Sequence, residues 1–226
     1  GANGQVILAN YTQSSVEISG TTSVTNNGSG TTKRVYLGNH GDITFQNNLT
    51  LTNNSNATNS EIYLNHETNS TNQYNGDINL SSNAAGCDGI KFGDRNGKGT
   101  LAISKNISIG TSFISGYLTF RNFTKLSTNA LSLLTTGTTY TVINNSEFNG
   151  NFSIQSPKVN LKNNTFSGTS LIHKTGPSDD ASYGGNVFTG NSEIKNSSTG
   201  YFLTGQYAPD SFGGNLLINN IGSKHI

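Results

Sequence analysis

The chain has 226 residues, with 13 Lys and Arg against 12 Asp and Glu and a formal net charge of +1. Charged residues make up only 11%, against about 25% in an ordinary globular domain. This balance, with no basic run, argues against a nucleic-acid partner. The 34 Asn and 27 Gly accompany 11 Phe and 9 Tyr, and so many aromatic residues are not typical of a disordered chain. We therefore expect an ordered β-protein with a thin core.

Helices, membrane spans and disulfides are all disfavoured. No long segment has apolar residues at helical spacing, and no apolar run approaches the roughly 18 residues of a membrane span. Cys87 is the only cysteine, so no disulfide can form within the chain. The absence of Met agrees with an oxidising exterior. We expect a secreted or cell-surface location.

The first predicted strands form a repeat. The strings VILAN, VYLGN, IYLNH and IKFGD begin at Val6, Val35, Ile62 and Ile90, at spacings of 29, 27 and 28 residues. Each string alternates apolar and polar side chains, which is typical of a strand with one buried side.

A second pattern combines an aromatic residue, a small or turn residue two positions later and an aliphatic residue six positions later. The aromatic residues are Phe45, Tyr74, Phe148, Phe166, Phe188 and Phe212. The turn residues are Asn47, Gly76, Gly150, Gly168, Gly190 and Gly214, and the aliphatic residues are Leu51, Leu80, Ile154, Ile172, Ile194 and Ile218. Together the two patterns predict a unit of turn, strand, turn and strand over roughly 28 residues.

Units of this size must stack to bury their apolar sides, so the repeat predicts a solenoid. The fold class that we expect is all-β: a parallel β-solenoid of the right-handed β-helix type. Equivalent aromatic residues would then lie above one another, and asparagines would form amide ladders inside the turns. The Asn-Gly and Ser-Gly steps tolerate the left-handed backbone that tight turns require.

We expect one elongated domain over residues 1–226. Units of about 28 residues cover 6–99, less regular coils cover 100–147, and shorter coils cover 148–226. Phe148, Phe166, Phe188 and Phe212 lie 18, 22 and 24 residues apart, which predicts one coil between each pair.

The two ends have complementary repeats. The chain opens on a strand of the first pattern and closes just after one of the second, so joining tail to head would nearly complete a unit. One interpretation is a period of a tandem array, or a subunit that stacks end to end. The other is an arbitrary boundary.

Several strings resemble a known kind of protein. They are YNGDINLSSNAAGCDGIKFGD, SGYLTFRNFT, LKNNTFSGTSLIHKTG and GGNVFTGNSEIKNSSTGYFLTG. They resemble the Asn/Gly/Thr-rich tandem-repeat β-helix modules of giant secreted surface proteins of Bacteroidetes-type bacteria, over most of the chain. The resemblance implies export and a role in adhesion or extracellular fibres, and it brings no catalytic residues.

We find no pattern that predicts catalysis, a metal site or a cofactor. The acids are mostly isolated, which disfavours the paired carboxylates of a carbohydrate-active enzyme. The densest polar cluster joins Cys87 and Asp88 to Lys91, Asp94, Arg95 and Lys98, and we interpret it as a solvated strand edge, with an ion site as the alternative. Asp179 and Asp180 are interpreted as part of a turn, with Ca²⁺ binding as the alternative.

Four tyrosines are candidates for glycan binding: Tyr36, Tyr63, Tyr201 and Tyr207. Tyr36 and Tyr63 fall at outward-facing strand positions, and an exposed tyrosine suits the ring face of a sugar. The leading hypothesis is nonetheless a structural module that stacks end to end as a stiff stalk or filament, with no enzymatic activity. A carbohydrate-binding adhesin is the first alternative and a β-helical carbohydrate-active enzyme the second.

Overall fold

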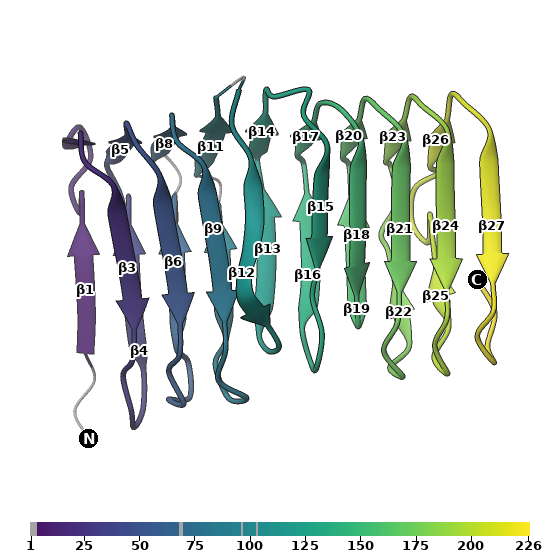
Figure 1. Ribbon diagram of the computed structural model, residues 1–226, viewed down its shortest axis with the longest axis horizontal. Coiled ribbons are helices and arrows are strands. Elements are labelled where there is room, and N and C mark those ends of the chain that lie inside the picture. Colours follow the sequence, from purple (N-terminus) through teal and green to yellow (C-terminus); the bar gives the residue numbers. More distant parts are fainter. Residues whose placement is uncertain (1–3, 68–69, 96, 103) are drawn as a thin grey trace.

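The chain folds as a parallel β-solenoid. The computed structural model describes residues 4–67, 70–95, 97–102 and 104–226. Over these residues it contains 27 strands and no helix, and every strand pair is parallel. The coils follow one another along the long axis, from the N-terminal to the C-terminal end of the row (Figure 1).

Each coil contributes one strand to each of three faces. Face 1 consists of a seven-stranded sheet and a two-stranded continuation: β1 (Gly4–Leu8), β4 (Lys33–Leu37), β7 (Glu61–Leu64), β10 (Gly89–Phe92), β13 (Tyr117–Arg121), β16 (Tyr140–Asn144) and β19 (Lys158–Lys162), then β22 (Asp180–Ala181) and β25 (Phe202–Leu203). Face 2 is a nine-stranded sheet: β2 (Ser15–Ile18), β5 (Asp42–Phe45), β8 (Thr71–Tyr74), β11 (Lys98–Leu101), β14 (Phe123–Lys125), β17 (Glu147–Phe148), β20 (Thr165–Phe166), β23 (Val187–Phe188) and β26 (Ser211–Phe212).

Face 3 contains two sheets of four and five strands. They are β3 (Thr22–Asn26), β6 (Leu49–Asn53), β9 (Ile78–Ser82) and β12 (Ile107–Phe113), then β15 (Leu131–Leu134), β18 (Phe152–Ser156), β21 (Ser170–Lys174), β24 (Ser192–Asn196) and β27 (Leu216–Asn220). The expectation of two strands per unit was therefore wrong, because it missed face 2. Several face 2 strands have only two residues, too few to show an alternating pattern.

The repeat of the first pattern is confirmed by the register of face 1. Val6, Val35, Ile62 and Ile90 occupy one column, that is, equivalent positions in successive coils. Farther along this face the register pairs Tyr117 with Tyr140 and Tyr140 with Lys158, so the coil shortens to 23 and then 18 residues. The predicted change of coil length after residue 100 is thus confirmed.

The aromatic residues of the second pattern form a column inside face 2. Phe45 pairs with Tyr74, and Phe148, Phe166, Phe188 and Phe212 pair in series. Their rings stack at centroid distances of 5.7 Å for the first pair and of 5.8, 4.9 and 4.9 Å along the second series. One coil therefore separates successive members of that series, as the sequence predicts.

Two other side chains occupy the middle of this column. Leu101 pairs with Tyr74, and Lys125 lies between Leu101 and Phe148. Lys125 is fully buried, and its Nζ donates to the carbonyl oxygens of Ser127, Asn129 and Asn149, the last two at 2.6 and 3.0 Å. These carbonyls compensate for the loss of water around a buried polar group.

Asparagine ladders, which the sequence predicts, run through the interior. Asn164 donates from Nδ2 to Asn186 Oδ1 at 2.9 Å, and Asn186 donates from Nδ2 to Asp210 Oδ1 at 2.9 Å. The same oxygens also accept the backbone N–H groups of Asn164 and Asn186. Each coil is therefore bonded to the next through side chains as well as through strands.

The glycines of the second pattern serve close backbone approach more than backbone curvature. Gly150 has a φ of 79°, but Gly168, Gly190 and Gly214 need no left-handed backbone. A Cβ atom at Gly168 would lie 2.5 Å from the carbonyl carbon and oxygen of Gly150. The prediction that these steps tolerate the left-handed backbone explains Gly150 alone, because stacked turns exclude a side chain at the others.

This close approach makes a stability prediction. We expect Gly168→Ala to lower the free energy of unfolding by about 1–3 kcal/mol, the usual cost of overpacking. Gly20→Ala is the matched control, because a Cβ atom there would meet nothing within 4 Å. Urea unfolding followed by circular dichroism measures both variants, and an equal loss in the two would contradict the steric explanation.

Candidate functional site

The outer side of face 1 carries most of the aromatic and charged side chains that are candidates for function. Alternation along a strand directs every second side chain outward. On β13, β16 and β19 the register then aligns three outward rows. The tyrosine row is Tyr117, Tyr140 and Lys158, the middle row is Thr119, Val142 and Asn160, and the basic row is Arg121, Asn144 and Lys162.

In the N-terminal half of face 1, Tyr36 and Tyr63 point outward but are covered. Their rings stack at 5.0 Å with an interplanar angle of 6°, and His66 packs against both at 5.0 and 4.6 Å. Arg34 and Lys91 lie over the ring of Tyr63, at 6.0 and 5.1 Å from its centroid. The two tyrosines are only 8% and 5% exposed. The expectation that they are exposed sugar-binding residues was therefore wrong, because neighbouring coils cover them.

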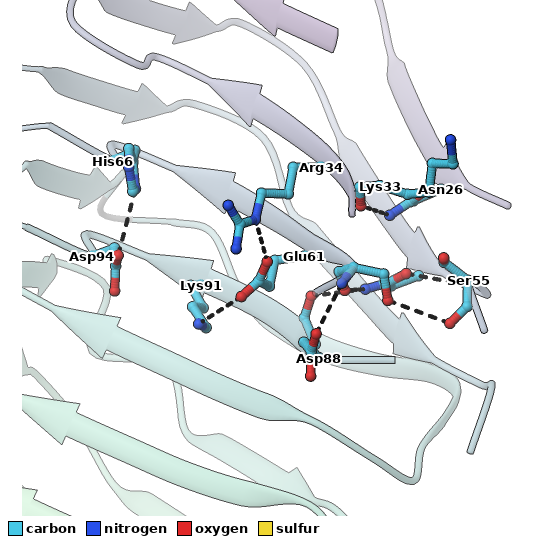
Figure 2. Close-up of polar contacts among 12 residues, drawn as sticks. Asn26, Lys33, Arg34, Ser55, Glu61, His66, Asp88, Lys91 and Asp94 are labelled. Atoms are coloured by element: carbon cyan, nitrogen blue, oxygen red, sulfur yellow. Dashed lines mark hydrogen bonds and ion pairs between the residues drawn. The ribbon is translucent and has the colours of Figure 1, made fainter. Parts of the chain in front are cut away.

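Glu61 holds this cover together (Figure 2). Its carboxylate accepts from Arg34 Nε at 2.7 Å and from Lys91 Nζ at 3.2 Å. Burial opposes ionisation of Glu61, but the hydrogen bond from Arg34 and the charge of Lys91 outweigh it and hold the pKa of Glu61 below its ordinary value. The three charged side chains thus satisfy one another across three coils.

His66 extends the same cluster. Its ring nitrogens lie 3.5 Å from carboxylate oxygens of Glu67 and Asp94, and Arg95 pairs with Glu67 at 3.3 Å. Burial lowers the pKa of His66 in spite of the two carboxylates, so the ring is neutral at pH 7. Figure 2 shows His66 directed toward Asp94 from the adjacent coil.

In the C-terminal half, the three rows form an open groove. A cavity of about 360 Å³ lies over the middle row, between the tyrosine and basic rows, and Tyr183 closes one end. A second cavity of about 410 Å³ shares Arg121, Asn144 and Lys162 with the first. Tyr117 and Tyr183 are 41% and 46% exposed. This part of face 1 therefore leaves aromatic surface accessible beside cations.

The other two candidate tyrosines lie near the C-terminal end. Tyr207 is 71% exposed, and its ring lies 5.0 Å from that of Tyr183, next to the groove. Tyr201 stacks on His225 at 5.6 Å, and its backbone N–H donates to Asp179. The structure therefore does not bring the four predicted tyrosines together, and only Tyr207 borders the groove.

The predicted cluster around Cys87 does not form one site. Cys87 is buried in a turn, where its Sγ lies 2.7 Å from Ser82 Oγ. Asp88 accepts the backbone N–H of Ser60 at 2.9 Å, whereas Lys91 and Asp94 take part in the charged cover described above. The described residues contain no group of three or more His, Cys, Asp or Glu side chains placed to hold a metal ion.

Comparisons with family models, with curated proteins and with solved structures found no match for this chain. No helix in the described part of the chain is long and apolar enough to cross a membrane.

Sequence reasoning missed the basic row and the buried lysines. Lys174, like Lys125, is fully buried, with its Nζ bonded to Gly176 O and, at 2.7 Å, to Ser198 Oγ. Arg121, Asn144 and Lys162 are 23 and 18 residues apart. Only an alignment that allowed both coil lengths would have placed them in one row.

Asp180 lies behind the groove and makes a pH prediction. Burial raises the pKa of Asp180 to about 6, against the hydrogen bond from the backbone N–H of Val159 and the charges of Lys174 and Lys158. The folded state therefore binds this proton more tightly than the unfolded state, and stability from Asp180 falls as pH rises from about 4 to about 6.

We expect Asp180→Asn to raise the free energy of unfolding at pH 8 by about 1–2 kcal/mol, allowing for solvent screening, and to change little at pH 4. Thermal melting at both pH values measures the effect. Asp179→Asn is the control, because that exposed carboxylate accepts a hydrogen bond from the Tyr201 N–H and has a lowered pKa. A loss of stability in Asp180→Asn at pH 8 would show that ion pairing outweighs burial.

Proposed function

We propose that the chain is a non-catalytic structural module of a secreted bacterial surface or fibre protein, which stacks end to end into a stiff stalk or filament. The observation that supports it most is the apolar surface on both end coils. Val6 and Leu8 on β1 are 59% and 39% exposed, and Ile218 on β27 is 59% exposed. Val35 and Ile194, their neighbours in the same columns, are 8% and 3% exposed.

The two end coils have the same arrangement on face 3. The inward positions of β3 are Thr22, Val24 and Asn26, and those of β27 are Leu216, Ile218 and Asn220. Both strands thus present an aliphatic residue and then an asparagine at the same spacing. A second copy whose β3 pairs with β27 would continue both the aliphatic column and the asparagine column.

Backbone groups at the ends support the same contact. The outer edges of β1 and β27 pair with no strand in the described part of the chain, and an unpaired parallel edge is a template for another strand. The contact would be head to tail, and such a contact repeats into an open filament unless its rotation closes a ring.

An extracellular location and the absence of catalysis belong to the same proposal. A stalk works by stiffness, and a solenoid held by strand pairing and by ladders such as Asn164–Asn186–Asp210 supplies it. The absence of Met and the single, buried Cys87 suit an oxidising exterior.

Electron microscopy and static light scattering of the purified chain test the proposal. Nine coils spaced by about 4.8 Å predict filaments with an axial repeat of about 43 Å. We expect the scattering mass to rise with concentration. A mass of 23.9 kDa at every concentration, with no filaments, would contradict assembly through the ends.

A further inference from the structure

The groove over β13, β16 and β19 takes no part in end-to-end stacking, because it lies on the side of the solenoid. Its floor is the middle row, whose members Thr119, Val142 and Asn160 are 3%, 8% and 7% exposed. Longer side chains of the tyrosine and basic rows form its walls. The rows run from coil to coil, so the groove follows the long axis. Such a shape suits a chain-like ligand better than a compact one.

The charges differ between the two halves of face 1. In the N-terminal half, Glu61 compensates Arg34 and Lys91, and Glu67 compensates Arg95. In the groove, Lys158 and Lys162 lie over the rings of Tyr140 and Tyr183 at 5.8 and 5.2 Å, and neither forms an ion pair with a carboxylate of the described residues.

The remaining carboxylates near the groove leave it positive. Asp94 Oδ1 is 3.8 Å from Arg121 Nη1, at the outer limit of an ion pair, and Asp180 is buried and bonded to the Val159 N–H. The groove therefore has two lysines and a weakly paired arginine available for an anion.

Two polar atoms of the basic row lack partners. Arg121 Nε and Asn144 Oδ1 are shielded from solvent and form no hydrogen bond. The two residues are paired in register on adjacent strands. Unsatisfied buried donors and acceptors are rare in native structures. A ligand with a carboxylate beside a hydroxyl group would satisfy the donor with one and the acceptor with the other.

Aromatic surface completes the groove. The rings of Tyr117 and Tyr140 lie 5.5 Å apart along the tyrosine row, and those of Tyr183 and Tyr207 lie 5.0 Å apart at the groove's end. An exposed tyrosine offers an apolar ring face and a polar hydroxyl at once. Sugar rings, which have apolar C–H faces and a hydroxyl rim, match this combination.

We propose that this groove binds an acidic polysaccharide lengthwise. Arg121 and Lys162 bind its acid groups, Asn144 accepts from a hydroxyl, and Tyr117 and Tyr183 contact the sugar rings. A nucleic acid is disfavoured, because the net charge is +1 and only a few cations line the groove.

Isothermal titration calorimetry of the chain with polygalacturonate, chondroitin sulfate and dextran tests the proposal. We expect binding to polygalacturonate and none to neutral dextran, and the sulfated glycan shows whether a sulfate replaces the carboxylate. Binding to dextran equal to that of polygalacturonate, no binding to either acidic glycan, or tighter binding to a single-stranded oligonucleotide would overturn the assignment.

Variants locate the site. We expect Arg121→Gln with Lys162→Gln to weaken binding of polygalacturonate about tenfold or more, since each loses a charge-assisted hydrogen bond. Lys162→Arg should retain most of the affinity. Lys195→Gln on β24 removes a charge from face 3, and Tyr11→Ala removes an exposed ring from the first coil, as controls for Lys162→Gln and Tyr117→Ala.

Melting curves show that each variant is folded. Equal weakening by Lys195→Gln would mean non-specific attraction and would overturn the groove as the site. Light scattering of the groove variants keeps this result separate from stacking, because the two ends are unchanged.

Discussion

Replacing Ile218 with lysine is expected to prevent end-to-end assembly. In β27 this side chain points inward, in one column with Ile194 and Ile172, but no coil covers it. A second copy would bury the new ammonium group against an apolar column, at a cost of several kcal/mol. The scattering mass of the variant should therefore stay at 23.9 kDa over the concentration range in which the unchanged chain grows.

Leu217 provides the matched control for this experiment. It is adjacent to Ile218 and almost equally exposed, 56% against 59%. Alternation directs Leu217 to the outer side of β27, so Leu217→Lys should leave assembly intact. If both substitutions stop assembly, the contact uses the side of the solenoid. If neither does, the apolar end of β27 is not the interface.

Much of the fold could be predicted from the sequence, because two columns have a chemically narrow membership. The series from Val6 to Ile90 is entirely β-branched and inward. The series from Phe148 to Phe212 is entirely aromatic. Stacked coils place like residues above one another, so a search for equal spacing finds them.

The middle of the solenoid could not be predicted in the same way. Leu101 and Lys125 occupy the column that aromatic residues fill elsewhere. A lysine seldom occupies a core column, and this one is accommodated because turn carbonyls accept all of its printed hydrogen bonds. The sequence contains no sign that distant carbonyls, such as that of Asn149, will be present.

The candidate site failed for a related reason. Alternation along a strand predicts which side chains point outward, and it is right for Tyr36 and Tyr63. Exposure depends instead on the next coils, where Arg34, His66 and Lys91 cover the two rings. The groove depends on the register of three coils that differ in length, so its rows are invisible to a search at one fixed period.

Replacing Phe166 with alanine is expected to cost about 3–5 kcal/mol of stability, the usual range for a buried phenylalanine. Its ring is fully buried and lies 4.9 Å from Phe188, 5.8 Å from Phe148 and 4.8 Å from Phe152. The side chain thus joins three consecutive coils. Urea unfolding followed by circular dichroism should show a lower midpoint, whereas Val187→Ala, at an outward position 40% exposed, should change the stability by less than about 0.5 kcal/mol.

Phe212 connects this stability series to assembly. It belongs to the same column, stacks on Phe188 at 4.9 Å, and lies on the last coil, where no further ring covers it. In a single chain Phe212→Ala should therefore cost less than Phe166→Ala. If copies stack end to end, the next copy covers Phe212, and the cost should rise with protein concentration, because assembly adds to the stability of the folded state. A cost that is independent of concentration would contradict stacking, even if filaments were seen.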